Sequence, residues 1–395
     1  MGNKKKIGII TYWESNDNYG QQLQCWALQH FLREQGYDAF LIRQYAWPQQ
    51  WSHKREWSKG IKQFIKYVIS RILYITHLAY KPYIYTLFSF CLDKDICLRQ
   101  FPQYRQRNLK MSQIYDSPDK LRDNPPNADV YIAGSDQIWN YCLDEGPISN
   151  YFLQFGPHQV RRIAYAPSLG QVFLPDAVQE RFKRYLRKFD SISVRESSSV
   201  TILKKLGYNT NCVLDPTMLL SADSYMQLLD GKGKKNECVF IYSMNYASAD
   251  EIPFDAVFEY AKIQQLPIVV TPGSGYLPTK ELFEGVEYSY ATIPQWIQHI
   301  LDAKLVITAS FHGVVFAILF HRPFIYTPLK GELANGNNRV LDLLKDLGLQ
   351  QYIIKTEYSI KDYVEIQTNW QEVDNKLNEL RKKSILYLFT AIENE

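Results

Sequence analysis

Residues 304–320 read KLVITASFHGVVFAILF, and this stretch predicts a buried strand that turns directly into a helix. The strand is the apolar run 304–308, and the helix is 313–320, which Pro323 brings to an end. Strands that alternate with helices are typical of parallel α/β layers. The stretch therefore favours an α/β fold.

His312 lies at the N-terminus of the predicted helix. Unpaired backbone N–H groups and the positive end of the helix dipole favour an anion there and disfavour a protonated imidazole. A neutral histidine beside a bound phosphate or carboxylate can move protons near pH 7. The alternative is a histidine that only caps its helix inside a core. We favour catalysis, because the small residues Ala309, Ser310 and Gly313 leave room for a ligand.

Two series of alternating strands and helices extend outward from this stretch. The first series has strands near 7–12, 39–42, 130–133, 163–166, 191–194 and 211–214, with helices near 21–35, 176–188 and 197–206. The second has strands near 238–243, 267–271, 305–308 and 324–326, with helices near 256–264, 294–302, 313–320 and 339–347. A joint rich in Gly and Lys, 231–236, separates them and indicates a domain boundary.

We therefore expect two doubly wound, Rossmann-like domains that face each other across a cleft, over 1–230 and 237–370. A length of 395 residues suits two such domains. The last helix, within 371–395, is long enough to pack back across the joint.

Composition narrows the class of protein. The chain passes from Lys4-Lys5-Lys6 straight into a predicted strand, and no apolar stretch is long enough to span a bilayer, so we expect a cytoplasmic protein without a signal peptide. The six cysteines and seven histidines are scattered, with no CxxC or HExxH spacing. We expect neither a metal site nor a cofactor.

Positive charge gathers in one segment. Between Arg43 and Lys110 thirteen Lys and Arg stand against three acidic residues, among many aromatic side chains. Within it, apolar residues recur at helical spacing from Ile61 to Leu73 and predict an amphipathic helix. We interpret 46–115 as a basic, aromatic insertion. Its ingredients suit an anionic membrane surface or nucleic acid, and the alternative is a helix packed on the domain with a solvated charged face.

Polar clusters follow several of the predicted strands, where ligands of parallel sheets bind. Asn18 and Gly20 open the first helix, and Asp136 and Gln137 follow the strand 130–133. Arg195 follows the strand 191–194, and Arg339 opens a later helix; a guanidinium grips carboxylate or phosphate bidentately. Each motif alone could be a helix cap or an ion pair, but their shared placement favours a site.

Several blocks in order make the chain resemble the polysaccharide pyruvyl transferases over about 7–347. The blocks are NYG at 18–20, LQ at 23–24, ALQ at 27–29, GSDQIWN at 134–140, AYAPSLG at 164–170, ISVRE at 192–196, VLDPT at 213–217 and SFHG at 310–313. The resemblance implies a glycosyltransferase-B-like fold. It also implies transfer of the pyruvyl group of phosphoenolpyruvate onto two hydroxyls of a sugar, giving a cyclic ketal and phosphate.

The resemblance implies that His312 is the catalytic residue, that Arg195 binds the donor and that Phe311 lines the donor site. We also count Arg195 among the catalytic residues. We add Ser310, Gly313 and Arg339 to the donor site, and Asn18, Gly20, Asp136 and Gln137 to the acceptor site. The expected partners are phosphoenolpyruvate and a sugar of a surface polysaccharide or its lipid-linked precursor, with peripheral contact to an anionic membrane and no nucleic acid. Two alternatives stay open: a glycosyltransferase that uses a nucleotide sugar, and a non-catalytic protein that binds carbohydrate or nucleic acid.

Overall fold

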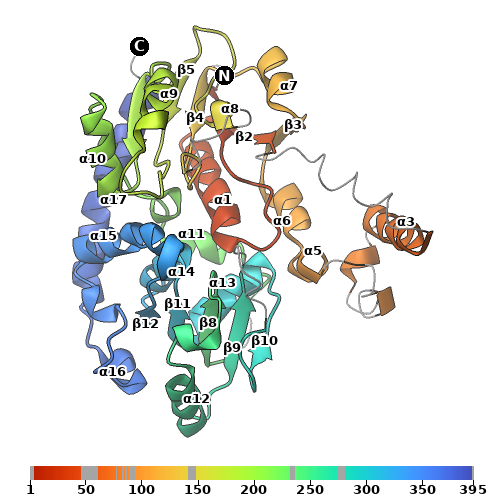
Figure 1. Cartoon of the computed structure of the whole chain (residues 1–395), viewed down its shortest axis with the longest axis vertical. Helices are drawn as coiled ribbons and strands as arrows, with labels where there is room; N and C mark the ends of the chain where they lie inside the picture. Colours follow the sequence, from red (N-terminus) through yellow and green to blue (C-terminus); the bar gives the residue numbers. More distant parts are fainter. Residues whose placement is uncertain are drawn as a thin grey trace.

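The computed structural model describes residues 4–45, 61–76, 78–81, 84, 87–88, 92, 94–140, 148–231, 236–273 and 281–393. Two parallel β-sheets form two lobes, the first in the upper half of Figure 1 and the second in the lower half, and helices cover both. The predicted α/β architecture of two doubly wound, Rossmann-like units is confirmed.

The first sheet has seven strands in the order β3-β2-β1-β4-β5-β6-β7, all parallel. The strands are β1 (Lys6–Ile10), β2 (Asp38–Gln44), β3 (Met111–Tyr115), β4 (Val130–Ala133), β5 (Arg161–Ala164), β6 (Ser191–Val194) and β7 (Asn211–Cys212). The strand order reverses between β1 and β4. Ligands of doubly wound sheets bind at such a reversal, beside the carboxyl ends of the strands.

The second sheet repeats this plan with five parallel strands in the order β10-β9-β8-β11-β12. The strands are β8 (Cys238–Ser243), β9 (Ile268–Pro272), β10 (Glu287–Tyr288), β11 (Ala303–Thr308) and β12 (Phe324–Tyr326). Every residue of β8, β9 and β12 is buried, which is why these strands are continuous apolar runs rather than alternating ones.

Helices connect the strands and cover both faces of the sheets. The helices of the first lobe are α1 (Tyr19–Glu34), α3 (Ile61–Ile75), α5 (Lys94–Arg99), α6 (Phe101–Asn108), α7 (Pro118–Asp123), α8 (Ile148–Tyr151), α9 (Asp176–Leu186), α10 (Ser197–Lys205) and α11 (Ala222–Met226). Those of the second are α12 (Phe254–Ile263), α13 (Ile293–Asp302), α14 (Phe311–Leu319), α15 (Asn338–Leu347), α16 (Ile360–Glu365) and α17 (Trp370–Glu393). The turns η2 (Leu78–Tyr80), η3 (Pro216–Met218), η4 (Ala249–Glu251), η5 (Gly331–Asn337) and η6 (Gln350–Tyr352) are 3-10 helices.

One hydrophobic core runs through both lobes. The first residue of α1, Tyr19, is fully buried, and its ring stacks on Trp296 of α13 with the ring centroids 5.3 Å apart. Its hydroxyl donates to Ala291 O at 2.6 Å. The carboxyl edges of the two sheets are therefore held face to face at the start of α1.

The helix α17 connects the lobes along the left side of Figure 1. Near its start, Asp374 pairs with His321 of the second lobe at 2.9 Å. Towards its end, Ser384 Oγ accepts from Leu214 N at 2.9 Å, and Lys5 donates to Ile392 O at 3.2 Å. The helix thus contacts both lobes.

Residues 111–115, which the sequence placed inside the basic insertion, form β3 at the edge of the first sheet. Only Tyr115 of this strand is buried, so its sequence lacks the apolar run that marks the other strands. The positively charged insertion also contributes to the core, because Arg99 of α5 and Arg105 of α6 are buried. Part of its charge is therefore structural rather than solvated.

The predicted amphipathic helix is α3, and its bounds agree with the apolar repeat. In Figure 1 it lies to the right, away from both sheets. Its Leu73 packs in a small separate core with Ala79, Leu92 and Cys97. Within the described ranges no helix is long and apolar enough to cross a membrane. The stretch 46–60, which holds the start of the insertion, lies outside the described residues.

Candidate active site

A tight strand-to-helix turn holds His312. Ser310 is the N-cap of α14, where its side chain accepts from Gly313 N at 3.4 Å, and its own N–H donates to Thr308 Oγ1 at 3.0 Å. A Cβ atom at Gly313 would lie 2.7 Å from the Thr308 side chain, so only glycine fits this close approach of helix and strand. Ser310 and Gly313 thus place His312 in the first turn of α14.

Gly20 of α1 lies against the His312 ring. A Cβ atom at Gly20 would overlap Nδ1 of His312, so the missing side chain is what lets the ring approach. His312 is 7% exposed. Because Nδ1 faces the helix, Nε2 is the ring nitrogen directed toward the other site residues.

Asp215 joins the histidine to Arg195, which comes from the other lobe. Arg195 follows β6 and donates through Nη1 to Asp215 Oδ2 at 2.6 Å. His312 Nε2 lies 3.6 Å from Asp215 Oδ1. Ser135 Oγ and the Thr217 hydroxyl also donate to this carboxylate, at 3.0 and 2.6 Å. The structure therefore brings His312 and Arg195 together on one buried acid.

The charges of this cluster stabilise one another. Burial alone would raise the pKa of Asp215, but His312, Arg195 and the Thr217 hydroxyl outweigh burial and hold the pKa well below its usual range. Burial likewise opposes the charge of Arg195, but Asp215, Asp136 and Glu196 raise its pKa. Both groups are therefore ionised at neutral pH.

Several nitrogen atoms in this cluster have no hydrogen-bond partner within the described part of the chain. They are Nε and Nη2 of Arg195 and Nε2 of His312, and all three atoms are buried. Buried polar atoms are almost always hydrogen-bonded in native proteins. Three such nitrogens around one carboxylate indicate a place where a ligand rich in oxygen atoms binds.

A second arginine reaches the site from α15. With the Gln137 amide oriented so that its oxygen faces Arg339, Nη2 and Nη1 of Arg339 donate to it at 2.8 and 3.1 Å. Burial and the neighbouring Arg195 lower the pKa of Arg339 to about 10, so it remains a cation at neutral pH. The ring of Phe311 lies 4.7 Å from the Arg195 guanidinium and 5.9 Å from that of Arg339. Both guanidinium groups thus contact the same aromatic ring.

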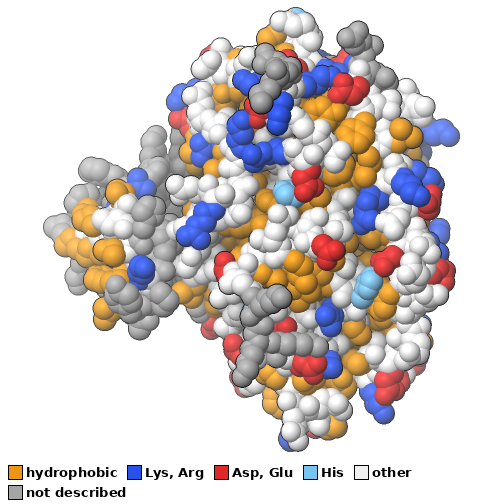
Figure 2. Space-filling model, turned by 180° about the vertical axis from the view of Figure 1, so that it is seen from behind, with side chains coloured by type: hydrophobic (Ala, Val, Ile, Leu, Met, Phe, Trp, Pro, Cys, Tyr) orange, Lys and Arg blue, Asp and Glu red, His pale blue; other side chains and the backbone are white. Residues whose placement is uncertain are grey.

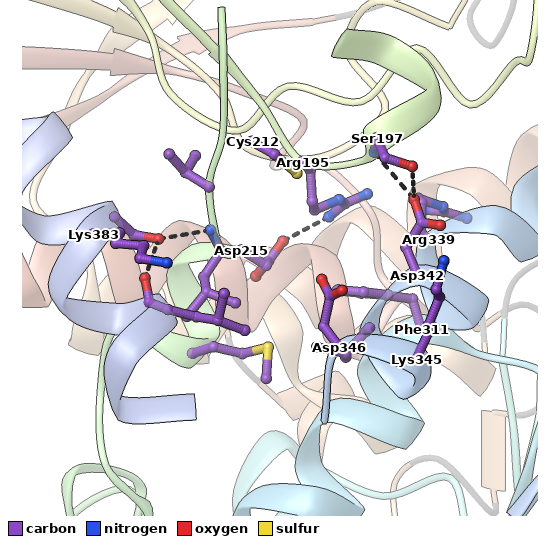
Figure 3. Close-up of a pocket in the computed structure, with 16 residues that line it drawn as sticks. Arg195, Ser197, Cys212, Asp215, Phe311, Arg339, Asp342, Lys345, Asp346 and Lys383 are labelled. Atoms are coloured by element: carbon purple, nitrogen blue, oxygen red, sulfur yellow. Dashed lines mark hydrogen bonds and ion pairs between the residues drawn. The ribbon is translucent and has the colours of Figure 1, made fainter. Parts of the chain in front are cut away.

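A pocket of about 200 Å³ opens beside these residues (Figure 3). Arg195, Asp215, Phe311 and Arg339 contribute to its wall. His312 is not among the wall residues and adjoins the pocket through Asp215. At its rim Ser197 N and Oγ donate to Asp342 Oδ2 at 3.1 and 2.6 Å, so the start of α10 is tied to the other lobe.

The model of the family described as polysaccharide pyruvyl transferase matches residues 18–328, which include every residue of this cluster except Arg339 and Asp342. The chain belongs to this family. The resemblance seen in the sequence is confirmed.

The solved structures compared with this member of the pyruvyl transferase family are distant from it in sequence. A structure from Listeria monocytogenes described as a UDP-N-acetylglucosamine 2-epimerase is similar at 10% identity and a TM-score of 0.48, over 96% of this chain and 91% of that one. An α-glucosyltransferase bound to UDP and DNA is similar at 8% identity and a TM-score of 0.47, over 98% and 95%. Likenesses this distant do not bear on function. No curated protein sequence matches the chain.

The four residues predicted for the acceptor differ in their surroundings. Asn18 is the N-cap of α1, where its Oδ1 accepts from Gln21 N at 3.0 Å, and Gly20 makes room for His312. Asp136 and Gln137 lie at the carboxyl end of β4 and are half-buried. Asp136 has a left-handed backbone with φ of 74°, and its Oδ1 accepts from Gln137 N at 2.8 Å. Only Asp136 and Gln137 stand beside the donors described above.

Asp215 had no role predicted from the sequence, although it lies within the block VLDPT. A signal was available, because Asp215 follows the predicted strand 211–214 and precedes Pro216, and an acid at the carboxyl end of a parallel strand is well placed for a site. Within the described ranges, no three His, Cys, Asp or Glu side chains are grouped as metal ligands would be.

Proposed function

We propose that the chain transfers the pyruvyl group of phosphoenolpyruvate onto two hydroxyls of one sugar, forming a cyclic ketal and releasing phosphate. The sugar belongs to a surface polysaccharide or to its lipid-linked precursor. The observation that carries the proposal is a set of buried nitrogens on Arg195 and His312 that have no hydrogen-bond partner among the described residues and that surround the ionised carboxylate of Asp215.

Phosphoenolpyruvate suits this cluster because its phosphate and carboxylate need cations. Arg195 offers Nε and Nη2, which point away from Asp215 and can bind an anion bidentately. Arg339 adds a second cation beside the Phe311 ring. The backbone N–H groups at the start of α14 complete the set of donors.

His312 is proposed as the acid and base. Its Nε2 gives a proton to the C3 methylene of the donor, and C2 becomes a cationic carbon. One sugar hydroxyl adds to C2 and returns its proton to Nε2. The bond between C2 and the phosphate oxygen then breaks, the second hydroxyl closes the ring, and its proton leaves with the phosphate. The two hydroxyl protons thus end on the new methyl group, by way of His312, and on the released phosphate.

Asp215 has a proposed role of its own in this chemistry. Because its pKa is held well below the usual range, it remains a carboxylate throughout the reaction. A fixed negative charge near a carbon that becomes positive stabilises the transition state more than the ground state. We assign Asp136 and Gln137 to the acceptor, since Gln137 contacts Arg339 and the charge of Asp136 acts on both arginines.

We extend the proposal to peripheral contact with an anionic membrane, where a lipid-linked acceptor would be found. The excess of Lys and Arg between Arg43 and Lys110 supports this contact.

The test is release of phosphate from phosphoenolpyruvate by the full chain, in the presence of a panel of lipid-linked sugars. We expect His312→Ala to lower the rate by about 100-fold or more, the usual contribution of a general acid. His158→Ala, at an exposed histidine, is the matched control and should leave the rate unchanged. Thermal shift with phosphoenolpyruvate and with nucleotide sugars runs alongside.

Two results would reject the proposal. One is near-normal phosphate release by a folded His312→Ala protein. The other is stabilisation by nucleotide sugars but not by phosphoenolpyruvate, which would identify a glycosyltransferase.

A further inference from the structure

The helix α3 carries two apolar stripes, and among the described residues one of them packs in a core while the other is exposed. Ile69 and Leu73 lie on the stripe that faces the small core around Leu92 and Cys97. The second stripe consists of Ile65, Val68, Ile72 and Ile75, whose exposed fractions are 51%, 38%, 55% and 73%. A helix of this length needs one apolar stripe to fold against its own domain, and the second is surplus to that need.

The second stripe forms a continuous face. Its members are separated by three, four and three residues, the spacing that places side chains on one side of a helix. Leu78 and Leu87, which follow α3, are also exposed, at 40% and 68%. Figure 2 shows orange side chains gathered on the part of the molecule that projects to the left, away from the two lobes. Contiguous exposed apolar surface of this kind marks an interaction site.

The charge around this face identifies its partner. The sequence from 57 to 92 contains five Lys and Arg and no Asp or Glu. Three of the cations, Lys66, Arg71 and Lys81, are exposed. A second copy of the chain would bring like charges together, whereas anionic lipid headgroups would attract them while the isoleucines enter the acyl boundary.

We infer that the face formed by Ile65, Val68, Ile72 and Ile75 docks on an anionic lipid bilayer, with α3 lying in the plane of the membrane. The inference rests on the proposed function for its purpose, access to a lipid-linked sugar. The docking itself needs no turnover. Because α3 lies away from both sheets, the rest of the molecule stays in water while the helix is embedded (Figure 1).

The experiment measures co-sedimentation of the full chain with vesicles of phosphatidylcholine alone or mixed with phosphatidylglycerol. We expect binding to the mixed vesicles that weakens as salt is raised. The double variant Ile72→Ser/Ile75→Ser should bind at least about tenfold more weakly, because it removes two of the embedded side chains. The matched control is Ile263→Ser/Leu386→Ser, which changes two highly exposed apolar side chains elsewhere, at 72% and 68%. The control should bind as the unchanged chain does.

Equal sedimentation with both vesicle types would overturn the inference, as would unchanged binding by the α3 variant. A dimer in solution that the α3 variant abolishes would assign the face to a second copy instead. Release of phosphate from phosphoenolpyruvate, with a soluble sugar as the acceptor, is measured on the same proteins. If the unchanged chain releases phosphate but does not bind the mixed vesicles, the docking alone is rejected. If the unchanged chain binds these vesicles but releases no phosphate, the proposed function alone is rejected.

Discussion

Asp215 is the residue on which the two lobes meet. Its two carboxylate oxygens have different partners, since Oδ2 accepts from Arg195 while Oδ1 lies beside His312 and accepts from Thr217. Burying a lone carboxylate is costly, and this one is stabilised only because its partners are in place. The same partners are the residues proposed to bind and protonate the donor. Stability and function are therefore linked through this one side chain.

That link predicts how stability depends on pH. Because the folded-state pKa of Asp215 is depressed, its contribution is complete above the ordinary carboxyl pKa of about 4 and is lost as the pH falls below it. We expect Asp215→Asn to lower the free energy of unfolding at neutral pH by about 3 kcal/mol, since Arg195 is left buried without its counter-charge. Thermal unfolding midpoints should show this gap narrowing below about pH 4.

The control for this prediction is Asp230→Asn, at an exposed position. Its midpoints should follow those of the unchanged chain at every pH. A gap between Asp215→Asn and the unchanged chain that persists undiminished in acid would show that the carboxylate contributes no charge-dependent stability.

For single residues, the sequence predicted where a site residue lies in its strand or helix better than it predicted which residues it contacts. His312, Arg195 and Arg339 were recognisable because each follows a strand or opens a helix, which local patterns reveal. Asp215 joins residues that are 20 and 97 positions away in the chain, and no local pattern encodes that meeting. The roles of Asn18 as a cap and of Gly20 as a space for His312 likewise follow from contacts that only the folded chain makes.

Among the elements, the contact between α1 and α14 decides where His312 lies. The two helices come from different lobes, and Gly20 lies where they meet. Tyr19, one residue earlier, is fixed between α13 and Arg99, so the start of α1 cannot retreat to make room. Any side chain at position 20 must therefore displace the histidine.

We predict that Gly20→Ala folds but loses activity. Alanine favours the helix, yet its Cβ overlaps the ring of His312, and such overpacking costs about 1–3 kcal/mol. Phosphate release should fall in kcat more than in the KM for phosphoenolpyruvate, because the histidine moves and the arginines do not. Steady-state kinetics and thermal unfolding measure the two effects.

The double variant Gly20→Ala/His312→Ala provides the matched comparison. Removing the ring relieves the overlap, so the double variant should regain the stability that Gly20→Ala loses, without regaining activity. Strictly additive losses of stability in the two single variants would refute the contact.

The elements themselves were largely predictable. Buried parallel strands are uninterrupted apolar runs, and the helices between them have clear stops, so the strands and helices predicted in both series lie within a few residues of their observed bounds. The strand β3 was not predicted because four of its five residues are not buried, and β10 was not predicted because it has only two residues. Edge strands are held by backbone pairing, which leaves little trace in the side chains.

At the scale of the whole molecule, three parts of the chain converge on Arg99. It belongs to α5, next to the small core that supports α3, and it is fully buried. Its Nη1 donates to the Tyr19 hydroxyl at the start of α1, and its Nη2 donates to Pro272 O at the end of β9. The guanidinium also lies 4.9 Å from the ring of Tyr290. One side chain thus connects the insertion, the first lobe and the second lobe, one residue away from the Gly20 contact with His312.

Arg99 should therefore transmit changes at the insertion to the site. We predict that Arg99→Met lowers the free energy of unfolding by about 3 kcal/mol, because buried acceptors on Tyr19 and Pro272 lose their donor. Below the unfolding temperature it should also lower kcat, since the start of α1 is no longer fixed against His312. Hydrogen exchange should rise in 16–24 and 287–292 but not in α9, which lies far from Arg99 in the sequence and packs in a different core. Arg187→Met, at an exposed arginine, should change none of these readouts.

The contradicting result is an Arg99→Met protein that is less stable but has unchanged kcat and unchanged hydrogen exchange at the start of α1. In that case Arg99 would not link the insertion, or the membrane face on α3, to the active site.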